Sequence, residues 1–141
     1  MRLIGFLVFT ALCAVAPFAA FADEMRTERV EFASGETGTS ITGSVAGYNS
    51  VDYLVVAAAG QTMVVNMKTD NLSSYFNILA PGEENAAFFV GSTEGNSYEG
   101  LLPQSGEYRI RVYLMRNAAR RDETANYTID IMITSSGDAN G

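Results

Sequence analysis

Arginine is concentrated in one short stretch of this 141-residue chain. Five arginines and no acidic residue lie between positions 109 and 121, whereas the rest of the predicted mature chain has three basic residues against sixteen acidic ones. Guanidinium groups offer fixed, permanently charged donors that suit carboxylates and other anions. Solubility does not require such clustering, so the stretch indicates a binding site. The five residues are Arg109, Arg111, Arg116, Arg120 and Arg121.

Catalytic residue types are scarce by comparison. The sequence has no histidine, and its single cysteine, Cys13, lies in the N-terminal segment that we predict to be a cleaved signal peptide. The mature chain therefore lacks the commonest general base, the thiol nucleophile and the usual zinc ligands. The carboxylate pairs Glu83-Glu84 and Asp122-Glu123 sit beside turn residues and are typical of solvated loops, and no calcium-loop spacing occurs. Two carboxylates brought together by folding could still hydrolyse a glycoside, but no spacing indicates it. We therefore predict a non-catalytic protein without metal or cofactor.

The first 22 residues have the pattern of a secretory signal peptide. Arg2 precedes an apolar run over residues 3–16, and a small-x-small end at Ala20-Phe21-Ala22 predicts cleavage near Ala22. A retained membrane anchor is the alternative, disfavoured because the run is short for a span of about 20 residues. Cys13 follows Leu12, where a lipoprotein signal needs a small residue, so we predict no lipid attachment. A periplasmic or secreted protein without disulfides is expected.

Charge and length constrain the mature protein further. The formal net charge is −7, and loss of Arg2 with the signal peptide makes it −8. An acidic chain of this kind is expected to avoid nucleic acid and anionic lipid and to favour cationic partners. The remaining length suits one domain, which we place at residues 23–134, followed by a small, polar and flexible tail at residues 135–141.

Hydrophobic alternation predicts strands and almost no helix. Gly60-Gln61 has the residues of a tight hairpin turn, and Pro81-Gly82 should end a strand. The spacing favours an all-β fold, a single antiparallel β-sandwich of about eight short strands, with a closed barrel as the alternative. After a short extended segment at residues 29–32, the expected strands cover residues 39–45, 51–58, 61–67, 74–79, 86–90, 97–102, 108–114 and 127–133.

The last two strands are the clearest. In each, tyrosine and aliphatic residues share one face, which is Tyr108, Ile110, Val112 and Leu114 in the first and Tyr127, Ile129, Ile131 and Ile133 in the second. Arg109 and Arg111 lie on the opposite face of the first strand. If the two strands pair antiparallel, these arginines would face Asp130.

A series of short motifs occurs in one order along nearly the whole mature chain. The most specific is the loop Arg116-Asn117-Ala118-Ala119-Arg120. Less specific are the Gly60-Gln61 turn and Ser105-Gly106-Glu107-Tyr108, because bacterial pre-peptidase C-terminal β-sandwich domains have a similar pair. The other motifs are Val30-Glu31-Phe32, Gly43-Ser44-Val45-Ala46-Gly47-Tyr48, Tyr53 with Ala59-Gly60-Gln61, the run from Leu102 to Val112, and Tyr127 with Ile129-Asp130-Ile131. Together these motifs resemble the periplasmic inhibitors of goose-type (g-type) lysozyme.

The resemblance implies a small β-sandwich inhibitor that protects peptidoglycan by plugging the active-site cleft of a g-type lysozyme. Arg116 and Arg120 would then insert toward catalytic carboxylates, with Asn117 shaping the loop or bonding to the partner. If short connections make the chain zigzag, the loop at Tyr48 gathers at the same end, and an aromatic beside arginines is a typical binding hot spot. We therefore add Tyr48 to the lysozyme-binding residues.

A second motif, at residues 105–108, is a weaker indication of a lysozyme-binding site. Related inhibitor families use a Ser-Gly-x-x-Tyr signature, and Ser105, Gly106 and Tyr108 match it with one spacer fewer. A strand of about 8 residues separates them from Arg116 by on the order of 25 Å, so the two motifs cannot share one small site. The alternative is a hairpin turn whose tyrosine packs into the core.

The sequence allows one alternative to a lysozyme inhibitor. The chain could be a non-catalytic β-sandwich module, resembling the pre-peptidase C-terminal domains, that binds glycan or protein. For the inhibitor, both a host lysozyme and one of the cell's own peptidoglycan-cleaving enzymes are open as targets. The sequence leaves the oligomeric state open as well.

Overall fold

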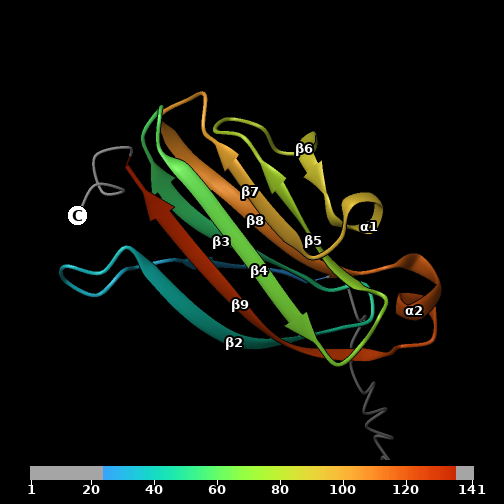
Figure 1. Cartoon of the computed structure of the whole chain (residues 1–141). Coiled ribbons are helices and arrows are strands. Elements are labelled where there is room, and N and C mark those ends of the chain that lie inside the picture. Colours follow the sequence, from blue (N-terminus) through green and yellow to red (C-terminus); the bar gives the residue numbers. More distant parts are fainter. Residues whose placement is uncertain (1–23, 136–141) are drawn as a thin grey trace, which may run out of the picture.

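The computed structural model describes residues 24–135 and shows two β-sheets packed face to face (Figure 1). The predicted signal peptide, residues 1–22, and residues 136–141 of the predicted tail lie outside the described residues. Among residues 24–135 no helix has the length and apolar character needed to cross a membrane. The elements are β1 (Met25–Arg29), β2 (Gly38–Ala46), β3 (Ser50–Ala57), β4 (Thr62–Thr69), β5 (Ser74–Leu79), β6 (Ala87–Val90), α1 (Gly91–Glu94), β7 (Ser97–Leu101), β8 (Gly106–Leu114), α2 (Arg116–Arg120) and β9 (Thr124–Thr134).

The strand order confirms the predicted sandwich. One sheet has the order β1-β3-β8-β5-β6 and the other β2-β9-β4-β7. The pairs in the described part of the chain are antiparallel except β1 with β3, which run parallel. Strand β1 covers residues 25–29, whereas the sequence indicated an extended segment at 29–32; all five of its residues are exposed, so it shows no alternation.

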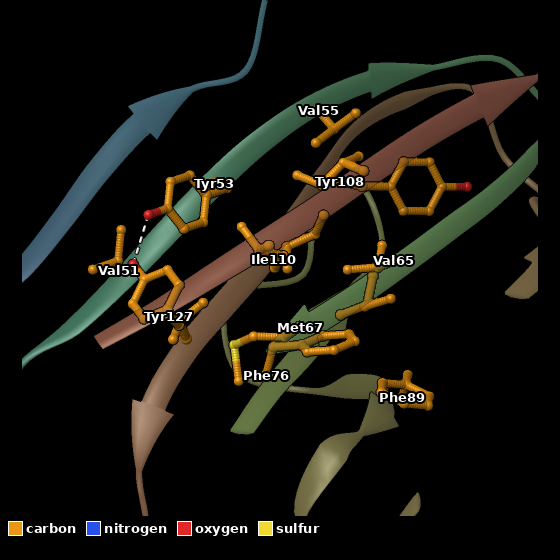
Figure 2. Close-up of a cluster of buried hydrophobic side chains, with 14 of the residues drawn as sticks. Val51, Tyr53, Val55, Val65, Met67, Phe76, Phe89, Tyr108, Ile110 and Tyr127 are labelled. Atoms are coloured by element: carbon orange, nitrogen blue, oxygen red, sulfur yellow. Dashed lines mark hydrogen bonds between the residues drawn. The ribbon is translucent and has the colours of Figure 1, made fainter. Parts of the chain in front are cut away.

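The core lies between the sheets and uses the faces predicted for the two clearest strands. The alternating tyrosine and aliphatic residues of β8 and β9 are buried. Figure 2 shows Tyr53 of β3 and Tyr127 of β9 meeting across the core, where their hydroxyl oxygens are 2.6 Å apart and share a hydrogen bond. Gly43 of β2 makes room for this pair, because a Cβ there would lie 2.7 Å from the Tyr127 hydroxyl oxygen. The buried hydroxyls therefore satisfy each other.

Two predictions about neighbouring strands are wrong, because in both cases the two strands belong to different sheets. Gly60-Gln61 does not close a hairpin, because β3 and β4 belong to different sheets and the turn carries the chain across the sandwich. Strands β8 and β9 also lie in different sheets, so Arg109 and Arg111 do not face Asp130. They face Asp52, because β8 pairs with β3 in a register that sets Arg111 opposite Asp52.

The connections gather at two ends of the sandwich, as the zigzag predicts. At one end, the backbone N–H of Gly47 donates to Glu123 at 2.9 Å, and that of Met115 donates to Ser73 at 2.8 Å. These bonds join the β2–β3 turn, the β4–β5 turn and the segment around α2, which lie together in Figure 1. At the other end, the N–H of Gly60 donates to the Leu102 carbonyl at 2.8 Å.

Candidate functional site

The segment predicted as an arginine loop is a one-turn helix, α2. Its alanines are good helix formers, and Ala118 and Ala119 are buried against the core. Arg116 and Arg120 are four residues apart, so they lie on the same side of the turn, and both are exposed. The helix thus places the two arginines on one exposed side, above two buried alanines.

The helix is held at both ends. The N–H of Met115, just before it, donates to the Ser73 carbonyl, and the N–H of Ala119 donates to the Met115 carbonyl at 2.9 Å. The side-chain oxygen of Asn117 accepts the N–H of Ala118 at 2.8 Å, so this asparagine satisfies a donor of the first turn. Residue Asp122, which follows the helix, has a positive φ of 53° and turns the chain into β9.

Arg116 and Arg120 differ from the other arginines in the described region in having no ion-pair partner there. Each remaining arginine of residues 24–135 pairs with a carboxylate, the pairs being Arg26–Glu28, Arg29–Glu107, Arg109–Asp52, Arg111–Asp52 and Arg121–Glu123. Two like charges at positions i and i+4 destabilise a helix slightly. Their placement is therefore not explained by the stability of α2.

Tyr48 lies at the same end, in the turn between β2 and β3. Its side chain is 48% exposed. The neighbouring Gly47 has φ 57° and donates its N–H to Glu123, and a Cβ there would lie 3.4 Å from a carboxylate oxygen of Asp122. The turn therefore packs closely against the segment that leaves α2, which brings Tyr48 to the arginine end as predicted.

Glu123 connects the third arginine of this segment to the β4–β5 turn. Its carboxylate accepts hydrogen bonds from the Asn71 amide at 3.0 Å and from the Arg121 guanidinium at 2.6 Å. The bond from Asn71, and then the bond and charge of Arg121, hold the pKa of Glu123 below its usual value. Arg121 is thus occupied within the protein, unlike Arg116 and Arg120.

Arg109 and Arg111 belong to a separate structural network on the outer face of β8. The Asp52 side chain is 0% exposed and takes two bonds from Arg111, at 2.7 and 3.0 Å, and a longer one from Arg109 at 3.4 Å. Hydrogen bonding to Asp52 raises the pKa of Arg111. Arg111 also donates to the backbone carbonyl of Glu84, so the β5–β6 connection covers the pair.

Ser105, Gly106 and Tyr108 lie at the opposite end from α2. The Ser105 hydroxyl accepts the N–H of Ala59 at 2.8 Å, and the buried Tyr108 donates its hydroxyl to the Gln104 carbonyl at 2.6 Å. Gly106 has φ 147°, and a Cβ there would lie 2.7 Å from the Cβ of Pro81. Tyr108 packs into the core as the alternative interpretation expected, but the turn crosses between sheets and is not a hairpin.

One exposed residue at the arginine end was missed from the sequence. Leu72, in the β4–β5 turn, is 91% exposed. The sequence does contain an indication of this residue. Leu72 is an isolated leucine between the turn-forming residues Asp70-Asn71 and Ser73-Ser74, where no predicted strand or helix would bury an apolar side chain. Within residues 24–135 the acidic side chains form no cluster suited to a metal ion.

The fold and the site together define a small β-sandwich that exposes Arg116 and Arg120 on a short helix at one end. No family model matches the sequence. A protein of Escherichia coli (strain K12) named "Inhibitor of g-type lysozyme" is 32% identical over 106 residues, which are 74% of this chain and 78% of that protein. The crystal structure of the Aeromonas hydrophila periplasmic inhibitor of g-type lysozyme superposes with a TM-score of 0.74 at 36% identity, covering 80% of this chain and 100% of the inhibitor.

The chain therefore belongs to the family of periplasmic inhibitors of g-type lysozyme. A pre-peptidase C-terminal domain of a Bacillus anthracis collagenase also superposes, with a TM-score of 0.50 at 16% identity over 80% of this chain and 97% of the domain. At that identity the likeness shows the sandwich fold alone.

Proposed function

We propose that this chain inhibits g-type lysozyme in the periplasm, and that it does so by inserting Arg116 and Arg120 into the active-site cleft. Tyr48 contacts the cleft rim beside them, and Asn117 keeps the first turn of α2 in shape. The predicted signal peptide, cleaved near Ala22, delivers the protein to that compartment. Membership of the inhibitor family supports the activity.

The observation that carries the arginine mechanism is the lack of partners at α2. Arg116 and Arg120 are exposed, adjacent and without an ion pair among residues 24–135, whereas the other arginines of that region are paired. Buried alanines and backbone hydrogen bonds fix the helix that carries them. The backbone of α2 therefore loses little conformational entropy when a partner binds, so the ordering that remains is that of the two arginine side chains.

The chemistry of the target fits this site. Glycoside hydrolases hold a pair of carboxyl groups beside the bond they cleave. A guanidinium that displaces substrate can donate two parallel hydrogen bonds to such a carboxylate, and it remains charged at any physiological pH. Two guanidiniums on one side of α2 could therefore fill a carboxylate-lined cleft and exclude the glycan.

The test is inhibition of cell-wall lysis by residues 23–141, titrated into goose-type and chicken-type lysozyme in parallel. We expect inhibition of the goose-type enzyme. The double variant Arg116→Ala with Arg120→Ala should raise the inhibition constant at least roughly a hundredfold, since two charge-assisted contacts are lost. Its melting temperature should hardly change, because exposed arginines contribute little to folding.

The matched control removes the same charge elsewhere. Arg26→Ala with Arg29→Ala deletes two exposed, ion-paired arginines of the edge strand β1 and should inhibit almost as well as the wild type. Equal inhibition by the wild type and the α2 variant would refute the arginine mechanism. Failure of the wild type against both enzymes would refute the inhibitor function and favour a binding module.

A further inference from the structure

Leu72 is the most exposed of the large apolar side chains in the described region, at 91%. It occupies the β4–β5 turn, between Asn71 and Ser73. Single exposed apolar residues are common on protein surfaces, so exposure alone assigns no role to it. The turn that carries it, however, is held by several hydrogen bonds.

Hydrogen bonds within the turn fix its backbone. The Asn71 side-chain oxygen accepts the N–H of Ser73 at 2.9 Å, and the Thr69 hydroxyl accepts the N–H of Asn71 at 3.1 Å. The carboxylate of Asp70 accepts the backbone and side-chain N–H groups of Asn126 at 2.8 and 2.9 Å. The turn is therefore preorganised, and presenting Leu72 to a partner requires little further ordering.

The same turn is bonded to α2 on both sides. The Ser73 carbonyl accepts the N–H of Met115, directly before the helix, and the Asn71 amide donates to Glu123, shortly after it. Leu72 lies between these two attachment points in sequence. Its position relative to Arg116 and Arg120 is thus fixed by the same contacts that hold the helix, and Figure 1 shows the β4–β5 connection beside α2.

None of these bonds uses the Leu72 side chain. They involve the main chain of residues 71 and 73 and the side chains of Thr69, Asp70 and Asn71, so a polar residue at position 72 could occupy the same turn. Because the leucine is almost fully solvated, it contributes little to the free energy of unfolding but offers nearly its whole surface for burial by a partner.

We propose that Leu72 is an apolar anchor of the inhibitory surface, which binds an apolar depression on g-type lysozyme beside its carboxylate-lined cleft. This inference rests on the proposed function, since it takes α2 as the part that enters the cleft. The arginines supply charge-dependent recognition, and Leu72 supplies an adjacent contact that does not depend on charge. Such an anchor slows dissociation, because it adds a short-range contact without long-range steering.

The test measures the binding kinetics of goose-type lysozyme with Leu72 variants of the full mature chain. Leu72→Ala should raise Kd roughly tenfold, and Leu72→Asp roughly a hundredfold, mainly through faster dissociation. Leu72→Met, which keeps volume and apolar character, should bind nearly as well as the wild type. Melting temperatures should agree within a few degrees for all variants, since the site is exposed.

Leu101 provides the matched control. It is 69% exposed, at the end of β7 next to Leu102, whose carbonyl is bonded to the turn at Gly60 far from α2. Leu101→Asp should leave Kd unchanged. The ratio of Kd between Leu72→Ala and the wild type should also stay constant as ionic strength rises, because apolar contacts are not screened.

The outcomes separate the two proposals. If Leu72→Asp binds like the wild type while the α2 double variant has lost inhibition, the anchor is wrong and the arginine mechanism stands. If the α2 variant inhibits normally, the arginine mechanism fails, and the position of Leu72 beside the cleft fails with it. If the wild type forms a dimer that Leu72→Asp dissociates, the leucine binds a second copy and the anchor is again wrong.

Discussion

Two arginine pairs from one short stretch of sequence have opposite surroundings. Arg109 and Arg111 bind the buried carboxylate of Asp52, whereas Arg116 and Arg120 are exposed and have no ion-pair partner in the described part of the chain. The difference arises from the elements that carry them. Arg109 and Arg111 lie on the outer face of β8, where the neighbouring strand β3 supplies Asp52. On the exposed side of α2, no carboxylate of residues 24–135 forms an ion pair with Arg116 or Arg120.

Arg121 shows that the position of an arginine in the fold decides whether it has an ion-pair partner. It directly follows Arg120, yet it pairs with Glu123 at 2.6 Å. Arg109 and Arg111 are part of the fold, because without the buried Asp52 carboxylate their charges would have reduced access to water, whereas the exposed Arg121–Glu123 pair adds little to stability. The two without partners can be altered at little cost to stability, which is the expected property of residues kept for binding.

Removing the Asp52 carboxylate, which binds Arg109 and Arg111, should have the largest effect, and this effect is on stability. Asp52→Asn keeps the shape of the side chain but leaves Arg109 and Arg111 without their counter-ion, and we expect the free energy of unfolding to fall by about 3 kcal/mol. Urea denaturation measures this loss. Asp130→Asn is the control, because the exposed Asp130 was the carboxylate expected from the sequence, and it should change stability by less than about 0.5 kcal/mol. Equal losses in both variants would contradict the network.

Replacing arginine by lysine in each pair should separate stability from inhibition. Arg116→Lys with Arg120→Lys keeps the charge but removes the paired donors, so Kd for goose-type lysozyme should rise roughly ten- to a hundredfold with an unchanged melting temperature. Arg111→Lys should do the reverse, lowering the melting temperature and leaving Kd unchanged, because its two bonds go to Asp52. The pattern is measured by calorimetry and binding kinetics on the same samples, and a loss of affinity in Arg111→Lys would contradict it.

Much of the fold was predictable because alternation is a local property. The inward faces of β8 and β9 follow directly from the spacing of tyrosine, isoleucine and valine, and short connections then imply which turns share an end. The assignment of strands to sheets was not predictable, since alternation is the same in both sheets. A Gly-Gln turn can join strands within a sheet or across a sandwich, which is why the hairpin at Gly60-Gln61 was wrong.

The arrangement of the candidate site was predictable only in part, because some of its contacts are distant in the sequence. The cluster of arginines was visible in the sequence, but its division into paired and unpaired residues depends on β3, which is distant in the chain. Asp52 stands alone among apolar residues of β3, and no local pattern links it to β8. Helix α2 has too few residues for a helical period. The isolated leucine at position 72 indicates an exposed side chain, but only the structure shows that its turn is bonded to either side of α2.

A smaller effect should come from salt. Raising ionic strength from about 0.01 M to about 1 M shortens the Debye length from about 30 Å to about 3 Å, which weakens attraction between exposed charges. We expect the association rate of the wild type with goose-type lysozyme to fall roughly tenfold, with a smaller change in dissociation. Stopped-flow mixing measures both rates. An association rate independent of salt would argue against steering by charge.

The smallest effect should be a pH dependence of the contribution that Glu123 makes to stability. The hydrogen bond from Asn71 to Glu123 joins the β4–β5 turn, which carries Leu72, to the segment after α2. Because the pKa of Glu123 is lower in the folded state than the usual value, the folded protein binds fewer protons there. Its contribution to stability is therefore present at neutral pH and is lost as pH falls through the lowered pKa. The melting temperature of Glu123→Gln should lie below that of the wild type at pH 7, and the gap should close as the pH falls below the usual pKa of a glutamate. In an Asn71→Ala background the gap should already be smaller at pH 7, since the largest cause of the shift has been removed. A gap that widened toward acid would mean that Glu123 is held in its neutral form, and the link between the turn and α2 would then need another explanation.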